Sequence, residues 1–81
     1  SHPKETNPKG ELQAILQDIL PETPSYETEE KGPRDAENRF ESRVFWHGHA
    51  IGAGSGASKR KAEVAAAADA LDARAWLRMT L

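Results

Sequence analysis

The sequence contains no cysteine, which excludes disulfide bonds and thiolate metal sites. It also lacks an apolar run long enough to predict a signal peptide or a membrane span, so we expect no membrane partner and a cytoplasmic location. A protein of 81 residues can bury one modest core but cannot build a large enzyme cleft. The sequence therefore predicts one small domain without a small-molecule substrate.

Positive charge is not in excess. Eleven Lys and Arg residues stand against thirteen Asp and Glu residues, and the formal net charge of −2 is a poor match to nucleic acid on the total alone. The acidic residues crowd the middle of the sequence, whereas Lys59, Arg60 and Lys61, the basic triplet, are adjacent. Because salt screens charges beyond about 10 Å, the field beside this triplet can be positive. The composition therefore leaves an anionic partner open.

Apolar residues at helical spacing predict a first helix from Lys9 to Leu20. Asn7 is a candidate N-cap, and Pro8 suits the first helical position. Residues 1–6 are polar and predict a flexible lead-in, and Ser1 is consistent with a remnant of an expression vector. The buried face of this helix would carry Leu12, Ile15, Leu16 and Ile19.

The middle of the sequence predicts three antiparallel strands in a meander. Polar and apolar residues alternate around Tyr26 and again from Arg39 to His47. Gly48 predicts a tight turn into a third strand at Ala50. One side of the second strand would carry Phe40, Val44 and Trp46.

The C-terminal third predicts an alanine-rich helix that begins after Ser58, its candidate N-cap. Its small, flat face lets it sit close against a sheet, and we expect the continuation through Arg74, Trp76 and Leu77 either to cover a sheet edge or to fray. This face carries Ala62, Ala66, Ala67, Ala70 and Leu71.

The stretch GAGSGASKRK, residues 52–61, is the first candidate binding feature. Its glycine spacing fits neither a P-loop nor a dinucleotide-binding loop. The basic triplet lies in the first turn of the predicted helix, where the helix dipole disfavours each cation by about 0.3–1 kcal/mol. An anion relieves both this penalty and the mutual repulsion of the cations. The two interpretations that remain are a polyphosphate site and a solvated charge cluster.

Two other features are candidates for binding. The connection from Gly32 to Asn38 is long for a hairpin, as expected of a loop that binds rather than merely closes. Lys9, Gln13 and Gln17 fall four apart and form a polar stripe beside the buried face of the first helix. On the residues alone, this stripe is interpreted as a solvated flank.

Several motifs together carry a family resemblance. They are NPKGELQAILQ in the first helix, PSYE at the first strand, Gly32-Pro33, Phe-x-Ser-x-Val-x-Trp-x-Gly from Phe40 to Gly48, IGAGSGASKRKAE from Ile51 to Glu63, and AAAADAL up to Leu71. In this order they resemble a double-stranded RNA-binding domain from about Asn7 to Leu71. Lys-Gly-x-Leu-Gln from Lys9 to Gln13, with Gly32-Pro33, is further similar to the C-terminal RNA-binding domain of bacterial ribonuclease III.

The resemblance implies an α+β fold, α-β-β-β-α, with a three-stranded antiparallel sheet and both helices packed on one face, over residues 7–78. In this family the first helix and the first inter-strand loop contact successive minor grooves of A-form RNA. The start of the last helix meets phosphates across the intervening major groove, a span of about 16 bp. The implied RNA-binding residues are Lys9, Gln13, Gln17, Gly32, Pro33, Arg34, Asp35, Ser58, Lys59, Arg60 and Lys61.

The resemblance also implies a role within a larger protein. The domain would capture double-stranded RNA for a ribonuclease III-like enzyme, largely independently of sequence, and would itself be neither catalytic nor in need of a cofactor. Catalysis, Mg²⁺ binding and homodimerisation would belong to a separate nuclease domain of the parent enzyme.

Three positions depart from the family pattern. Asp35 stands where the loop commonly has His, Glu63 where a basic residue is common, and Gly10 where Thr is frequent. A carboxylate accepts hydrogen bonds but cannot donate them, and it repels phosphates. Asp35 and the acidic total therefore support an alternative hypothesis, in which the fold is a protein–protein interaction or dimerisation module with weak or no RNA binding. The retained Lys59-Arg60 and Gln13/Gln17 oppose it, so RNA binding stays the main prediction.

Other chemistries find less support in the sequence. The nearest pairs of carboxylates are Glu29–Glu30 and Asp69/Asp72, and both are interpreted as solvated surface rather than as a catalytic site. His47 and His49 would share a face of a strand and could begin a metal site, but the sequence shows no third or fourth ligand.

Overall fold

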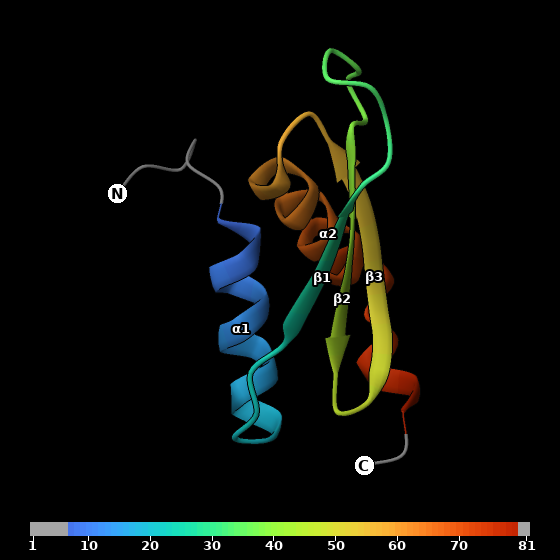
Figure 1. Cartoon of the computed structure of the whole chain (residues 1–81). Coiled ribbons are helices and arrows are strands. Elements are labelled where there is room, and N and C mark those ends of the chain that lie inside the picture. The colour runs from blue at the N-terminus through green and yellow to red at the C-terminus, as the bar shows by residue number, and fades with distance from the viewer. Residues whose placement is uncertain (1–6, 80–81) are drawn as a thin grey trace, which may run out of the picture.

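The computed structural model describes residues 7–79, and the expected lead-in at residues 1–6 lies outside them. The elements follow one another in the order α1 (Pro8–Ile19), β1 (Ser25–Glu30), β2 (Phe40–Trp46), β3 (His49–Gly56), α2 (Lys59–Ala73) and the 3-10 helix η1 (Ala75–Arg78) (Figure 1). This order confirms the α-β-β-β-α prediction.

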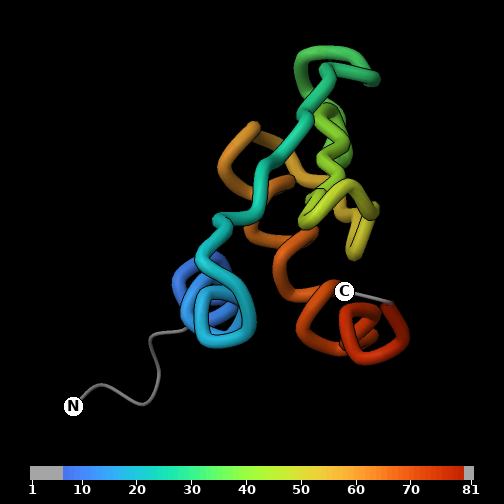
Figure 2. The backbone as a smooth tube through the Cα atoms, turned by 90° about the horizontal axis from the view of Figure 1, so that it is seen from below, coloured from blue at the N-terminus to red at the C-terminus, as the bar shows by residue number. Residues whose placement is uncertain are grey.

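The three strands form one antiparallel sheet in the order β1-β2-β3. Tyr26 lies opposite Val44, and Val44 lies opposite Gly52, so these residues share one face of the sheet. Both helices cover this face, as Figure 2 shows from one end of the sheet. The predicted layering, with two helices on one face, is therefore confirmed, and the other face of the sheet is left open.

The core lies between α2, the inner face of the sheet and one side of α1. Alternation along β2 puts Phe40, Val44 and Trp46 inward, as predicted. The indole Nε1 of Trp46 donates a hydrogen bond of 2.8 Å to the carbonyl of Glu22, so the one polar atom of this buried ring is paired. The core cluster contains Leu12, Leu16, Val44, Trp46, Ile51, Ala66, Ala67, Ala70 and Trp76.

The glycine-rich stretch is a strand and not a phosphate-binding turn. Gly52 and Gly54 lie in β3 and face α2 across the inner side of the sheet. A Cβ atom on Gly54 would lie 2.4 Å from the carbonyl carbon of Ala65, and one on Gly52 would lie 2.6 Å from the carbonyl oxygen of Ala66. These glycines therefore let the backbones of β3 and α2 approach closely, which is a packing role.

The hairpin between β2 and β3 is closed by His47 and Gly48, whose φ angles are 51° and 77°. Two central residues with positive φ are the mark of a type I′ turn, which suits the twist of a two-residue hairpin. Glu22 holds this turn from the α1–β1 connection: its carboxylate accepts from the His47 N–H at 3.1 Å and lies 2.9 Å from His47 Nδ1. This hydrogen bond with His47 keeps the pKa of the Glu22 carboxyl below its usual value.

The segment beyond α2 covers the core rather than fraying at Trp76. The helix ends at Ala73, and Arg74 adopts a left-handed conformation with a φ of 50°. The backbone then turns into η1, which leaves Trp76 only 6% exposed while Leu77 remains 69% exposed. Trp76 therefore does not fray but packs into the core cluster, whereas the expected alternative to fraying was cover of a sheet edge.

Candidate nucleic-acid interface

The segments predicted to bind RNA are α1, the β1–β2 loop and the start of α2. In Figure 1 the N-terminal ends of α1 and α2 and the β1–β2 loop all lie toward the upper end, whereas the β2–β3 turn lies at the lower end. The β1–β2 loop and the starts of both helices therefore lie in the upper part of this view, while α1 continues down to the level of the β2–β3 turn.

Gln13 and Gln17 are the exposed polar residues of the predicted stripe on α1. Each follows a fully buried leucine, Leu12 or Leu16, so the buried leucines fix the side of α1 on which the two amides emerge. Within residues 7–79, neither amide forms a hydrogen bond with another protein group. Both amides are therefore available to donate to and accept from a ligand.

Lys9 belongs to the same stripe but has different surroundings. Its Nζ lies 2.6 Å from Glu63 Oε1 on α2 and 4.8 Å from the centre of the Tyr26 ring on β1. The ammonium of Lys9 is thus neutralised within the domain. Sequence reasoning treated Glu63 only as a departure from a basic pattern and missed this ion pair, because the two residues lie far apart in the sequence.

The basic triplet occupies the first turn of α2, as predicted. The hydroxyl of Ser58 caps the helix, accepting from the Lys61 N–H at 3.1 Å. Lys59 and Arg60 are exposed, and among the described residues neither forms an ion pair. Lys61 is also exposed, but its Cβ lies close to the end of β3. A Cβ atom added to Gly56 would be only 2.7 Å from Lys61 Cβ. Lys61 therefore leaves the helix on a different side from Glu63.

The β1–β2 loop is closed by backbone hydrogen bonds. The N–H groups of Lys31 and Gly32 donate to the carbonyl of Arg39 at 2.6 and 3.0 Å. The Ala36 N–H donates to the carbonyl of Pro33 at 3.0 Å, which makes a turn with Arg34 and Asp35 at its corner. Pro33, Arg34 and Asp35 are exposed, whereas Gly32 is half-buried. The turn therefore presents two side chains of opposite charge.

Arg39 anchors the base of this loop and was not found from the sequence. Its Nε pairs with the carboxylate of Glu30, and its guanidinium lies 4.8 Å from the centre of the Phe40 ring. An arginine directly before an aromatic residue at a strand start is the signal that could have indicated this anchor.

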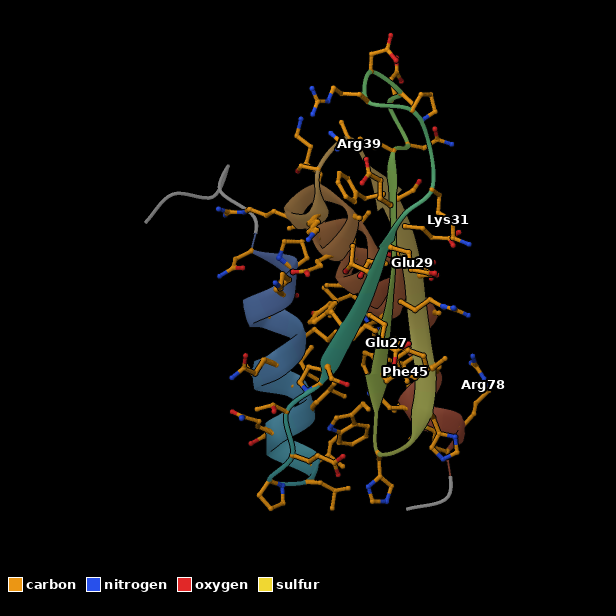
Figure 3. All side chains as sticks on the ribbon, in the orientation of Figure 1. Glu27, Glu29, Lys31, Arg39, Phe45 and Arg78 are labelled. Carbon is orange, nitrogen blue, oxygen red and sulfur yellow. The ribbon has the colours of Figure 1, made fainter. Side chains whose placement is uncertain are left out.

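Negative charge gathers on the open face of the sheet, away from the helices. Glu27, Glu29 and Glu41 point to this face because Tyr26, Thr28 and Ser42 point to the helices. Lys31 Nζ lies 3.8 Å from the Glu29 carboxylate and 3.5 Å from the Glu41 carboxylate. Figure 3 shows Glu27, Glu29 and Lys31 one after another along β1 and just beyond its end. Glu27, Glu29 and Glu41 therefore face away from α1 and α2.

Most candidates for catalysis or metal binding have structural contacts; those of Glu29 with Lys31 and of Glu30 with Arg39 are described above. Asp69 accepts from the Ala53 N–H at 3.0 Å and thereby covers part of the exposed edge of β3. His47 is paired with Glu22. Across residues 7–79, no group of three or more His, Asp or Glu residues is arranged to hold a metal ion.

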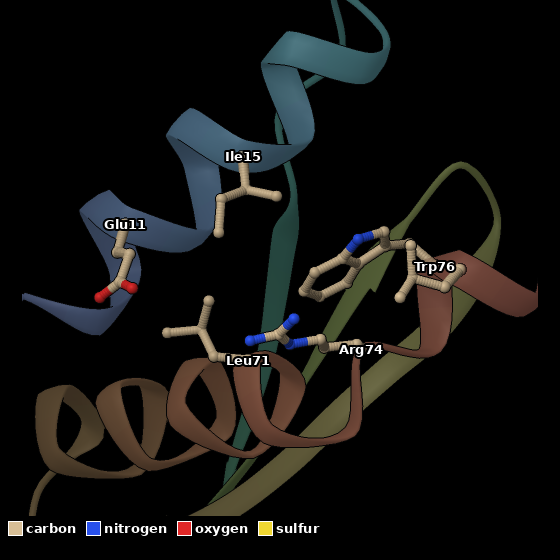
Figure 4. A pocket seen from close by; sticks show the side chains of 6 residues that line it. Glu11, Ile15, Leu71, Arg74 and Trp76 are labelled. Atoms are coloured by element: carbon tan, nitrogen blue, oxygen red, sulfur yellow. The ribbon is translucent and has the colours of Figure 1, made fainter.

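A groove of about 230 Å³ lies between α1 and the end of α2 (Figure 4). Apolar side chains form most of its walls, with one carboxylate and one guanidinium beside them. None of the predicted RNA-binding residues lines it, so it is separate from the polar surface described above. The lining residues are Glu11, Ile15, Leu71, Arg74, Trp76 and Leu77.

An amide pair, an exposed turn and a group of cations are spread over three elements of a small α-β-β-β-α domain, an arrangement that suits an extended polyanion better than a small ligand. The family model described as the double-stranded RNA binding motif matches residues 8–73. The protein belongs to this family and is a double-stranded RNA-binding domain.

One curated relative is the protein named "Ribonuclease 3" of Desulforamulus reducens, which is 42% identical over 62 residues. The match covers 76% of the present sequence but 25% of the relative, so it spans about a quarter of the length of that protein. Within the described residues, no helix has the length and apolar character needed to cross a membrane.

Proposed function

We propose that this domain recognises double-stranded RNA by its A-form shape, largely independently of sequence, through three contacts. Lys59 and Arg60 would meet phosphates, Gln13 and Gln17 would enter one minor groove, and the Pro33–Asp35 turn would enter the next. The observation that carries the proposal is the placement of charge. Lys59 and Arg60 are exposed without acidic partners among the described residues, while Glu27, Glu29 and Glu41 point to the sheet face opposite the helices.

Each contact has a chemical reason. The 2′-hydroxyl, which distinguishes RNA from DNA, both donates and accepts hydrogen bonds, as the amides of Gln13 and Gln17 do. Phosphates favour the cations of Lys59 and Arg60, and the unpaired N–H groups at a helix start add to that attraction. In the turn, Arg34 is the residue that can donate to the RNA, whereas the carboxylate of Asp35 can only accept.

We further propose that the domain serves a larger ribonuclease III-like enzyme of the cytoplasm. The similarity to the protein named "Ribonuclease 3", together with the short span of the match, supports this role. The domain would hold duplex RNA, while a separate nuclease domain would bind Mg²⁺, dimerise and cleave. The RNA-binding domain would need no cofactor for its own part.

The test is a titration of the domain into a fluorescent 20 bp RNA duplex, the DNA duplex of the same sequence and the single strand, at two salt concentrations. We expect selective, salt-sensitive binding to the RNA duplex. K59A/R60A should weaken that binding about tenfold or more and should lower the salt slope by about one for each lost phosphate contact.

The matched control is R43A, which removes a cation from the open face of the sheet. We expect this variant to bind as the wild type does, apart from the small effect of one distant charge. An unchanged salt slope for K59A/R60A would contradict the phosphate role. A lack of RNA binding by the wild type at low salt would contradict the proposed function and favour the protein-interaction hypothesis.

A further inference from the structure

We infer that Glu63 is a positioning residue that fixes α1 relative to the start of α2, and thereby sets the spacing between the RNA contacts of the two helices. This inference rests on the proposed function and deepens it. It assigns a role to the position where the family pattern commonly has a basic residue.

The carboxylate of Glu63 is held by two elements at once. Oε1 lies 2.6 Å from the ammonium of Lys9 on α1, and Oε2 lies 3.3 Å from the hydroxyl of Thr28 on β1. The Thr28 hydroxyl also lies 2.9 Å from the hydroxyl of Ser42, which is fully buried. Because the Thr28 hydroxyl has one proton, Ser42 donates to Thr28 when Thr28 donates to Glu63. Hydrogen bonds therefore connect the buried Ser42, through Thr28, to Glu63 on α2.

Lys9 is held just as firmly on its side. Its ammonium contacts the Glu63 carboxylate and also lies over the ring of Tyr26, so its position is defined by both α2 and β1. The side chains of Lys9 and Glu63 are only 38% and 26% exposed, so water screens this pair less than a fully exposed one. Burial and the nearby Glu63 charge raise the pKa of Tyr26, as expected if a carboxylate stands close to that ring.

The position of the pair along the helices connects it to the RNA surface. Gln13 lies four residues after Lys9 on α1, and Lys59 lies four residues before Glu63 on α2. Four residues span about 6 Å along a helix and return to nearly the same side, so each partner of the ion pair is a direct neighbour of one proposed contact. A shift of the two helices at this pair would therefore change the distance between Gln13 and Lys59, while the groove spacing of the RNA stays fixed.

The substitution E63K gives opposite results under two hypotheses. If this position were simply a phosphate contact that the domain has lost, E63K would tighten binding and raise the salt slope by about one. If Glu63 positions the helices, E63K sets a second ammonium against that of Lys9, and binding weakens although the domain has become more positive.

The experiment measures the dissociation constant for the 20 bp RNA duplex and for the matching DNA duplex, at a temperature where circular dichroism shows each variant to be folded. We expect E63K to weaken RNA binding about fivefold, because restoring the helix spacing that the RNA requires would cost about as much free energy as one partly exposed ion pair contributes. E63Q keeps an oxygen that can accept from Lys9 or Thr28 and should weaken binding about twofold. The preference for RNA over DNA should fall with both variants, because Gln13 is displaced.

The matched control is D72K, which makes the same change of charge at an exposed position on α2 that has no ion-pair partner within the described residues. It should leave RNA binding unchanged or slightly tighter. Weaker binding by E63K and E63Q, with D72K at least as tight as the wild type, supports the inference. Equal or tighter binding by E63K overturns it while leaving the proposed function intact. A wild type that does not bind duplex RNA overturns the proposed function and, with it, this inference.

Should E63K fail to fold, E63Q decides the question alone. It removes a negative charge from the neighbourhood of the RNA, so long-range electrostatics predicts tighter binding. A loss of affinity and of RNA-over-DNA preference therefore supports positioning, and an affinity equal to or above that of the wild type contradicts it. A purely structural role would lower the melting temperature and leave both binding readouts of the folded protein unchanged.

Discussion

Replacing Gly54 with alanine tests the packing role of the glycine-rich strand. A Cβ at this position would lie 2.4 Å from both the carbonyl carbon of Ala65 and the amide nitrogen of Ala66. Ordinary contact begins at 3.4 Å, so α2 would have to retreat by about 1 Å. A gap of this width between α2 and the sheet would remove about a quarter to a half of the dispersion energy of the atoms in contact there.

We expect G54A to lower the free energy of unfolding by about 2 kcal/mol, because a 2.4 Å contact with backbone atoms places it at the upper end of the overpacking range. Overpacking typically destabilises a protein by about 1–3 kcal/mol. Replacing glycine also lowers the conformational entropy of the unfolded state, which stabilises the domain by about 0.5–1 kcal/mol. For a domain of this size, the melting temperature should fall by about 10 °C or more. Urea unfolding monitored by circular dichroism gives the free energy, and a thermal scan gives the midpoint.

The matched control is S55A, on the same strand but facing away from α2, which we expect to change stability by less than about 0.5 kcal/mol. G54A with the stability of the wild type but weaker RNA binding would refute this reasoning. That result would restore a ligand-binding role to the glycines.

Two further predictions concern hydrogen bonds. The hydroxyl of Tyr26 is buried without a hydrogen-bond partner among the described residues, so Y26F should leave the urea midpoint unchanged or raise it; a clear fall would reveal a partner for the hydroxyl. The pKa of Glu22 is lowered in the folded state, so its contribution to stability is present above the unfolded pKa and is lost as the pH falls through the folded pKa. The difference in urea midpoint between wild type and E22Q should therefore shrink below about pH 4.5 and vanish in stronger acid, whereas a difference independent of pH would contradict the pairing.

Local patterns are sufficient to predict the elements of the fold. Asn7 and Pro8 define the start of α1, and Ser58 defines that of α2, because capping depends on residues within one turn. The alternation in β2 is equally informative, since strand periodicity is likewise local. The same reasoning fails for β3: glycine is depleted in strands, so the glycine-rich stretch suggests a turn, and only the close packing of α2 explains why it is a strand.

The sequence predicts the position of a candidate site residue only where that position depends on the residue's own helix alone. The exposed positions of Gln13, Gln17 and Lys59 follow from helical spacing. The pairing of Lys9 with Glu63 does not, because it depends on how two helices from opposite ends of the sequence cross. No pattern in one sequence indicates that contact.

The arrangement of charge explains how a protein with a net charge of −2 can present a surface to a polyanion. In a strand, neighbouring residues point to opposite faces, so Glu27 and Glu29 on β1 and Glu41 on β2 all reach the open side while Tyr26 and Thr28 face the helices. Arg43 and Lys31 offset part of this negative charge, whereas Lys59 and Arg60 lie at the start of α2, which packs on the other face of the sheet. We therefore expect a duplex to approach the start of α2 rather than the open face, and the acidic residues that lower the net charge would then oppose RNA binding less than the total suggests.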